Sequence, residues 1–125
     1  MIKVKIRNIL DANDALTRLS QNTLPIKTSY DIAKVLNRVR EEVRIYDTER
    51  IKMLEKHGTL NEEKTEYVFE TPEKMQAFQK EHNELMDVDV EIDVKPIVLK
   101  STDNIRITAQ EIINLGAFVE VVDCD

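Results

Sequence analysis

The side chain most suited to a chemical role in this sequence is Arg50, which stands in the middle of an apolar stripe. An unpaired charge buried there would cost several kcal/mol, so we expect it to meet a carboxylate. Glu81 and Glu84, on a helix expected to face it, are the natural candidates. Such an ion pair would fix the register of the two helices. Alternatively, the aliphatic part of the arginine packs on the core while its guanidinium reaches water. The alternative is an anion or ligand site between the helices.

The two histidines and the single cysteine lack the neighbours that metal binding or catalysis requires. His57 stands at the end of one predicted helix and His82 on the stripe of another, and neither has a second histidine or cysteine at ligand spacing. Cys124 has no histidine near it in the sequence, and it has no second cysteine for an internal disulfide, which is typical of a reducing cytosol. We therefore expect no metal and no cofactor.

Acidic residues alternate from Asp89 through Glu91 to Asp93, so their carboxylates point to one side of an expected strand. They could attract a cation, but the stretch lacks the glycine and the downstream glutamate of a calcium loop. The whole chain holds two glycines, too few for a phosphate-cradling loop, and it has no Gly-x-Ser-x-Gly elbow. The residues give no positive case for an enzyme, and we expect no catalytic residues.

Charge is distributed unevenly over the 125 residues. The net charge is −6, with a balance of +4 over residues 1–60 and −10 over residues 61–125. An acidic chain is a poor general binder of phosphate groups, so direct nucleic-acid binding is not expected. The two halves should attract each other, within one chain or between chains. No apolar segment reaches the length of a membrane span, and no signal peptide is predicted.

One long amphipathic helix, predicted over residues 30–57, must position most of these side chains. Its apolar residues recur at alternating intervals of four and three, the spacing of a helix that packs along its length against another. Thr28 and Asp31 have the spacing of a capping box, and Gly58 stands where a left-handed residue commonly ends a helix. Basic and acidic residues are interleaved on the opposite face, as on an ordinary solvated helix.

The remaining pattern predicts shorter elements around the long helix. The clearest boundary is a threonine N-cap followed by proline at Thr71 and Pro72, which predicts a second helix to residue 86, antiparallel to the first. Further helices are expected near residues 9–20 and 108–116, and strands near residues 2–7, 88–94, 97–99 and 105–107. Residues 67–69 are expected to form a short strand or an extended arm, and residues 118–122 a last strand or a docked tail.

Two of these strands carry charges of opposite sign at the same spacing. Strand 2–7 presents basic residues on its outer face, and strand 88–94 presents acidic ones. Opposite charges that face each other across a ladder contribute up to about 1 kcal/mol per pair. We therefore predict that the strands pair and that their charged side chains form an interaction site. These residues are Lys3, Lys5, Arg7, Asp89, Glu91 and Asp93.

Several segments together resemble a group of small phage proteins. They are Leu-Thr-Arg-Leu-Ser, Leu-Pro-Ile-Lys-Thr-Ser-Tyr-Asp-Ile-Ala-Lys, Glu-Arg-Ile-Lys-Met-Leu-Glu-Lys-His-Gly and Phe-Gln-Lys-Glu-His-Asn-Glu-Leu-Met, followed by the acidic strand. In this order they are similar to small uncharacterised proteins encoded in tailed-phage and prophage genomes, over most of residues 10–100. The likeness lies in pattern more than in diagnostic motifs. It implies a phage origin and residence in the cytoplasm of a bacterial host, and it supplies no catalytic residues.

We expect a single α+β domain over residues 1–125, in which a long helical hairpin packs with a short N-terminal helix and a small mixed or antiparallel sheet. The incompletely covered long helix and the bipolar charge favour a non-enzymatic protein that acts through protein–protein association. It would be a homo-oligomer, or a partner of a phage or host protein, and a virion-assembly or accessory component. The alternative is a phage-encoded inhibitor of a bacterial defence system, acting as an acidic nucleic-acid mimic or by sequestering an anionic nucleotide near Arg50.

Overall fold

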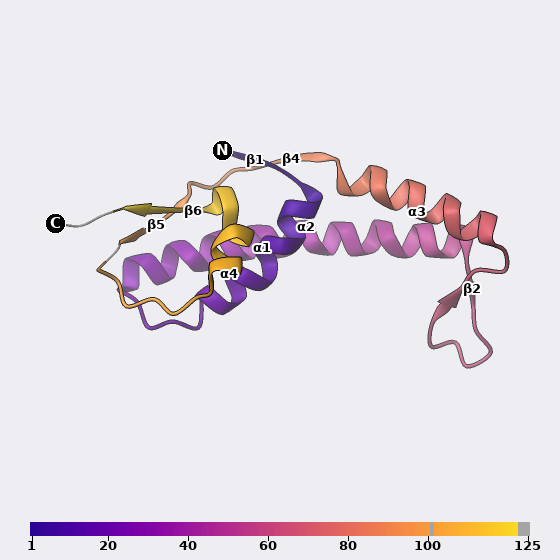
Figure 1. The fold of residues 1–125 in the computed structure, drawn as a ribbon, viewed down its shortest axis with the longest axis horizontal. Coiled ribbons are helices and arrows are strands. Elements are labelled where there is room, and N and C mark those ends of the chain that lie inside the picture. Colours follow the sequence, from indigo (N-terminus) through magenta and orange to yellow (C-terminus); the bar gives the residue numbers. More distant parts are fainter. Residues whose placement is uncertain (101, 123–125) are drawn as a thin grey trace.

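A computed structural model describes residues 1–100 and 102–122 and shows an α+β fold with a long helical hairpin (Figure 1). The helices are α1 (Ile6–Leu19), α2 (Ile26–His57), α3 (Pro72–Met86) and α4 (Ala109–Leu115), followed by a 3-10 turn, η1 (Gly116–Phe118). The strands are β1 (Ile2–Lys5), β2 (Thr59–Leu60), β3 (Tyr67–Val68), β4 (Asp89–Ile92), β5 (Ile97–Lys100) and β6 (Val119–Val122).

Helix α2 runs along most of the molecule and divides it into two parts (Figure 1). Its 32 residues span about 48 Å at about 1.5 Å per residue. We call the first part the head: residues 1–43, 88–100 and 102–122, which hold α1, α4 and the strand pairs β1–β4 and β5–β6. We call the second part the arm: residues 44–87, which hold the end of α2, the hairpin β2–β3 and α3. Helix α3 returns antiparallel along α2.

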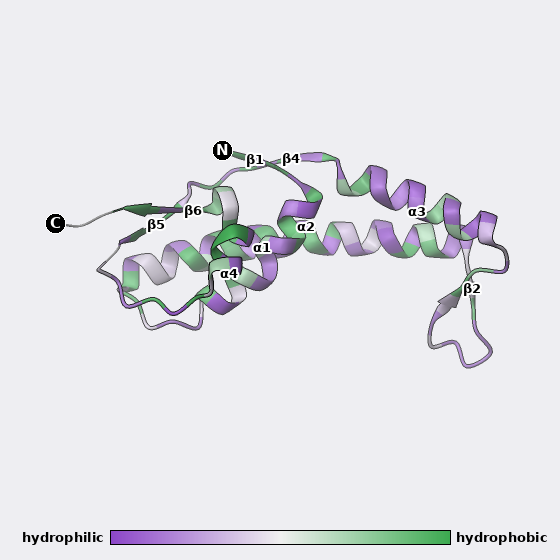
Figure 2. Ribbon diagram, viewed as in Figure 1, coloured by the Kyte–Doolittle hydropathy of each residue, from purple (hydrophilic) through white to green (hydrophobic). Residues whose placement is uncertain are grey.

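The hydrophobic core lies almost entirely in the head. The arm contributes Tyr46, at 8% exposure, whereas no residue of α3 is buried. Figure 2 shows the same contrast, since hydrophilic colour covers much of α3 and of the loop beside β2. A core therefore holds the head, and only a narrow seam between two helices holds the arm. The largest fully buried side chains of the head are Ile9, Leu16, Leu19, Ile32, Val39, Ile92, Ile97, Leu115 and Phe118.

The predicted pairing of the N-terminal strand with the acidic strand is confirmed. β1 and β4 are antiparallel, with Ile2 opposite Ile92, and both side chains are buried. Strand β1 is shorter than predicted because α1 begins at Ile6. There the Asn8 side chain accepts a hydrogen bond from the Lys5 amide at 3.0 Å, which satisfies a donor at the start of the helix.

Strands β5 and β6 form a parallel pair, with Ile97 opposite Val119 and Leu99 opposite Val121. The expected small sheet is therefore not one sheet. Within the described residues there are three two-stranded ladders, two antiparallel and one parallel.

The strand predicted at residues 105–107 is wrong. This segment is irregular, and the Arg106 amide donates to the Asn22 side chain at 3.0 Å instead of joining a ladder. Ile105 and Ile107 nevertheless pack against the core of the head. The alternation of these isoleucines with polar residues therefore reflects burial of one side of an irregular segment, and it does not indicate pairing with another strand.

The two helices of the hairpin differ in how well their starts were predicted. Helix α3 begins as predicted, with Pro72 in its first turn and the Thr71 hydroxyl accepting a hydrogen bond from the Lys74 amide at 3.2 Å. Helix α2 begins earlier than predicted, at Ile26, because Pro25 is its N-cap. The expected capping residues Thr28 and Asp31 lie inside the helix, where Asp31 pairs with Lys27 at 3.4 Å.

Gly58 ends α2 as predicted, but not in a left-handed conformation. Its φ of −116° and ψ of 175° are extended. The need for glycine is steric: a Cβ at this position would lie 3.1 Å from the carbonyl oxygens of both Leu54 and Val68. Glycine thus lets β3 approach the end of the long helix closely. Gly116 likewise ends α4, with a φ of +50°.

The N-cap of α3 supports a first prediction. Thr71→Ala should destabilise α3 by about 1 kcal/mol, because the Lys74 amide loses its acceptor. Thr71→Ser keeps a hydroxyl and should retain most of the stability. Hydrogen exchange of the α3 amides measures the change, and Thr65→Ala, outside the helix, is the control. Equal protection in Thr71→Ala and Thr71→Ser would contradict the prediction.

Candidate protein–protein interface

The predicted interaction residues of β1 and β4 meet across the ladder. Lys3 is opposite Glu91, and Lys5 is opposite Asp89. The Lys3 ammonium lies 4.0 Å from the Asp89 carboxylate, diagonally across the strands. Both side chains are more than half exposed, so the pair is screened by water and adds little stability.

Arg7 and Asp93 do not take the places that the strand pattern predicts. Arg7 lies in α1, and its guanidinium donates to Asp87 at 2.6 and 3.0 Å. Lys5 reaches the same carboxylate at 4.0 Å. Asp93 lies beyond the end of β4. The basic and acidic faces therefore neutralise each other largely within one chain.

The predicted partner of Arg50 is wrong. Its Nε lies 3.5 Å from Asp47 Oδ1, one turn earlier on α2, and its side chain stays 39% exposed. Glu81 instead accepts a hydrogen bond from Lys56, and Glu84 is exposed on α3. Arg50 escapes the cost of burial by keeping its head near water at the border of the seam. No ion pair in the described residues joins it to either glutamate of the hypothetical ligand site.

Both histidines lie in the seam between α2 and α3. The Tyr46 hydroxyl is hydrogen-bonded to Nε2 of His82, whose ring stacks on Phe78 at a centroid distance of 5.7 Å. Phe69 extends the cluster, 5.3 Å from Phe78. Burial raises the pKa of Tyr46, so the phenol stays neutral near pH 7. Aromatic stacking and one hydrogen bond thus set the register of the arm.

Glu81 is held by the last two residues of α2. Lys56 donates to its Oε1 at 2.8 Å, and His57 Nε2 lies 3.1 Å from the same oxygen, although without the angles of a full hydrogen bond. The hydrogen bond from Lys56 and the nearby His57 hold the pKa of the Glu81 carboxyl below its ordinary value. These contacts join the end of α2 to the second half of α3.

We predict that this carboxylate makes the arm sensitive to acid. A group whose pKa is lowered by folding stabilises the folded state above its ordinary pKa, and that stabilisation is lost as the pH falls through the lowered value. Protection of the α3 amides, corrected for intrinsic exchange, should therefore decline as the pH falls below the ordinary value of 4.5. Glu81→Gln should flatten this decline, whereas Glu84→Gln should leave it. The prediction fails if both variants follow the wild-type profile.

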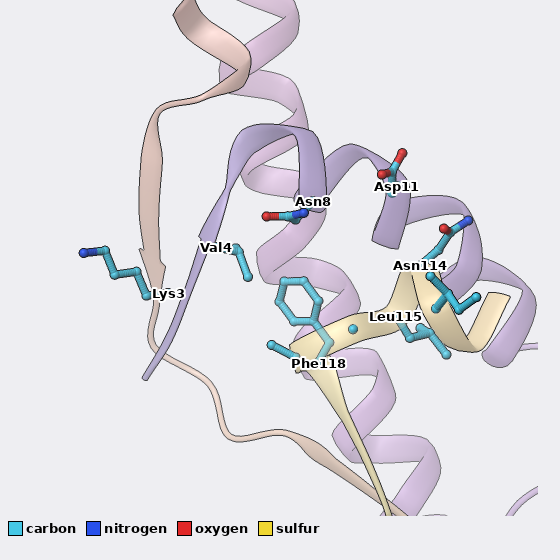
Figure 3. Close-up of a pocket in the computed structure, with 10 residues that line it drawn as sticks. Lys3, Val4, Asn8, Asp11, Asn114, Leu115 and Phe118 are labelled. Carbon is cyan, nitrogen blue, oxygen red and sulfur yellow. The ribbon is translucent and has the colours of Figure 1, made fainter. Parts of the chain in front are cut away.

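A cleft of about 410 Å³ opens beside β1, on the side away from β4 (Figure 3). Val4 and Phe118 lie at its floor, between β1 and the turn η1, while Asn8 and Asp11 of α1 border it. It brings together segments more than a hundred residues apart in the chain, so no local pattern could predict it. Its lining offers an open strand edge and no set of convergent catalytic groups.

The outer face of α2, turned away from the core and from α3, carries exposed apolar side chains. We define it by Tyr30, Arg44, Ile45, Thr48, Ile51 and Glu55. Tyr30, Ile45 and Ile51 are 64%, 58% and 42% exposed. In the sequence, the interleaved charged residues of this face resemble those of an ordinary solvated helix, so its exposed apolar residues do not stand out as a surface. The exposed isoleucines are the signal that could have identified it.

Within residues 1–100 and 102–122, no group of three histidine, cysteine, aspartate or glutamate side chains is placed to hold a metal ion. None of the helices of this part combines the length and the apolar character that a membrane span requires. Cys124 lies outside the described residues.

No known protein family, curated protein or solved structure matches the chain.

Proposed function

We propose that this protein is non-enzymatic and acts through protein–protein association, with a second copy of itself as its partner. The observation that carries the proposal is the arm, in which α3 buries no residue while apolar side chains remain exposed. Ile45 and Ile51 lie along the arm, and Leu60, Val68 and Met75 lie near its tip, each more than 40% exposed.

An arm of this kind gains stability when another chain covers it. Two antiparallel helices with one narrow seam bury little apolar surface, and burial contributes about 25 cal/mol per Å². Clusters of exposed apolar side chains on a projecting element are typical of association sites. Covering the arm would remove these side chains from water at no further cost to the core of the head.

The cellular setting is proposed from the sequence resemblance alone. We propose a phage-derived assembly or accessory protein that works in the cytoplasm of a bacterial host, or in the virion. A phage or host protein would then be a further partner.

Native mass spectrometry and light scattering of the purified protein test the association. We expect one homo-oligomeric mass, with a dimer as the simplest case, at both low and high salt. High salt screens exposed ion pairs but not apolar burial. A monomer mass at every concentration and salt would overturn the proposal.

The loop between β2 and β3 supports a second candidate function, an inhibitor of a bacterial defence system that mimics nucleic acid. Glu62, Glu63 and Glu66 are exposed there, with Lys64 as the cation among them. An acidic loop at the tip of an arm can occupy a basic nucleic-acid site on another protein. This candidate predicts that a host nuclease co-purifies with the protein and is lost when the three glutamates are changed to glutamine. The β1–β4 ladder contributes little to such mimicry, because its acidic face already meets lysines.

A further inference from the structure

The outer face of α2 carries a pair of opposite charges in a self-complementary arrangement. Arg44 and Glu55 lie about three turns apart, so they share one strip of the helix. Neither has an ion-pair partner within the described part of the chain, and the nearest hydrogen-bonding contact of Glu55 is the Tyr67 hydroxyl at 3.5 Å. Thr48 and the partly exposed Ile51 lie between them on the same face.

We infer that a second copy docks antiparallel along this face, about a twofold axis that passes between the two α2 helices at the level of residues 49 and 50. This inference rests on the proposed self-association. The axis places Arg44 of each copy opposite Glu55 of the other and Thr48 opposite Ile51. A twofold axis makes each contact twice, so two ion pairs flank a central patch of isoleucine and threonine.

Other charges agree with the same register. Glu41 of one copy comes opposite Gly58 of the other, so the nearest cation there is Lys56, two residues before it at the end of α2. The acidic β2–β3 loop lies beside this face, as the contact between Tyr67 and Glu55 shows. In the pair it reaches the groove between α1 and α2 of the second copy. That groove has a volume of about 460 Å³ and is lined by Asn13, Asn37, Arg40, Glu41, Val43 and Arg44.

The charge order favours a reversed copy of the same helix over other partners. In a parallel arrangement Arg44 would face Arg44, and like charges across an interface cost affinity. A uniformly acidic partner such as nucleic acid would meet Glu41 and Glu55 as well as the arginines. An antiparallel copy matches both signs along the strip and also covers the exposed Ile51 at its centre.

Charge reversal tests the register. Arg44→Glu places glutamate opposite glutamate at both ends of the homodimer, and Glu55→Arg places arginine opposite arginine. Each single variant should raise the dimer dissociation constant by about 100-fold or more. Mixing the two variants should restore a one-to-one heterodimer, because both contacts then join opposite charges. Native mass spectrometry distinguishes the heterodimer if one variant carries a heavy-isotope label.

Two variants of α3 serve as controls, because they make the same changes in net charge at positions outside the outer face of α2. Lys80→Glu and Glu84→Arg alter the net charge equally, and they should leave the dimer unchanged. Circular dichroism checks that all four variants are folded. If Arg44→Glu and Glu55→Arg keep the wild-type mass, or if the mixture fails to recover a heterodimer, this register is wrong although self-association stands. A monomeric wild-type protein would overturn both.

Discussion

Replacing Phe118 by alanine should lower the free energy of unfolding by about 3–5 kcal/mol, the usual cost of deleting a buried aromatic ring. The ring is 1% exposed and points from η1 toward Val4 of β1 (Figure 3). Contacts of η1 with α1, α4 and β1 make it a junction of the head. Because small domains are stable by only about 5–15 kcal/mol, the variant should be partly unfolded at physiological temperature.

Chemical denaturation followed by circular dichroism measures this loss. Phe118→Leu is the matched control, since it retains most of the apolar volume and should lose less than half as much stability. A Phe118→Ala protein as stable as the Phe118→Leu protein would show that the head does not depend on this ring.

Replacing Phe78 by alanine should instead loosen the arm and leave the head folded. Phe78 stands between Phe69 and His82 in the seam, where it is half-buried. Its removal should reduce the free energy of opening of α3 by about 2 kcal/mol, roughly half the cost at a fully buried site. The aromatic stack that aligns His82 with the Tyr46 hydroxyl would be lost with it.

Residue-resolved hydrogen exchange separates the two parts. In Phe78→Ala, amides of α3 and of residues 44–57 should exchange faster, while amides of α1 and α4 keep their wild-type protection. Gln79→Ala, at an exposed position of the same helix, is the control and should have little effect. Equal acceleration in the head and the arm would show that the molecule opens as one unit.

Local signals predicted the elements that depend on a few neighbouring residues. The threonine and proline at the start of α3 gave its boundary because N-capping is decided within one turn. At the start of α2, Thr28 and Asp31 have the spacing of a capping box. Pro25 caps the helix one turn earlier, and without the fold the sequence does not distinguish the two starts. The long-range pairing of β1 with β4 was predictable because their charge patterns match.

Features that depend on distant segments could not be predicted. The parallel pairing of β5 with β6 carries no charge pattern, and parallel partners are separated by a connection that gives no register. The partner of Arg50 could not be predicted, because the apolar pattern places Arg50 on the seam but does not show that its guanidinium reaches the solvent-exposed edge. The outer face of α2 could not be recognised in the sequence, because solvent exposure and not spacing distinguishes Ile45 and Ile51 from core residues.

The placement of the arm within the chain has a consequence for synthesis on the ribosome. Every contact inside the arm joins residues between 44 and 87, so it can form as soon as that stretch has emerged. The head is completed later, because Ile2 of β1 pairs with Ile92 of β4 and the core includes Phe118. The more weakly held part can thus be completed before the part with the core, although α1 and α2 can already pack against each other. Until Phe118 is made, the nascent chain exposes the apolar side of α1 that α4 and η1 later cover, and a chaperone would find its binding site there.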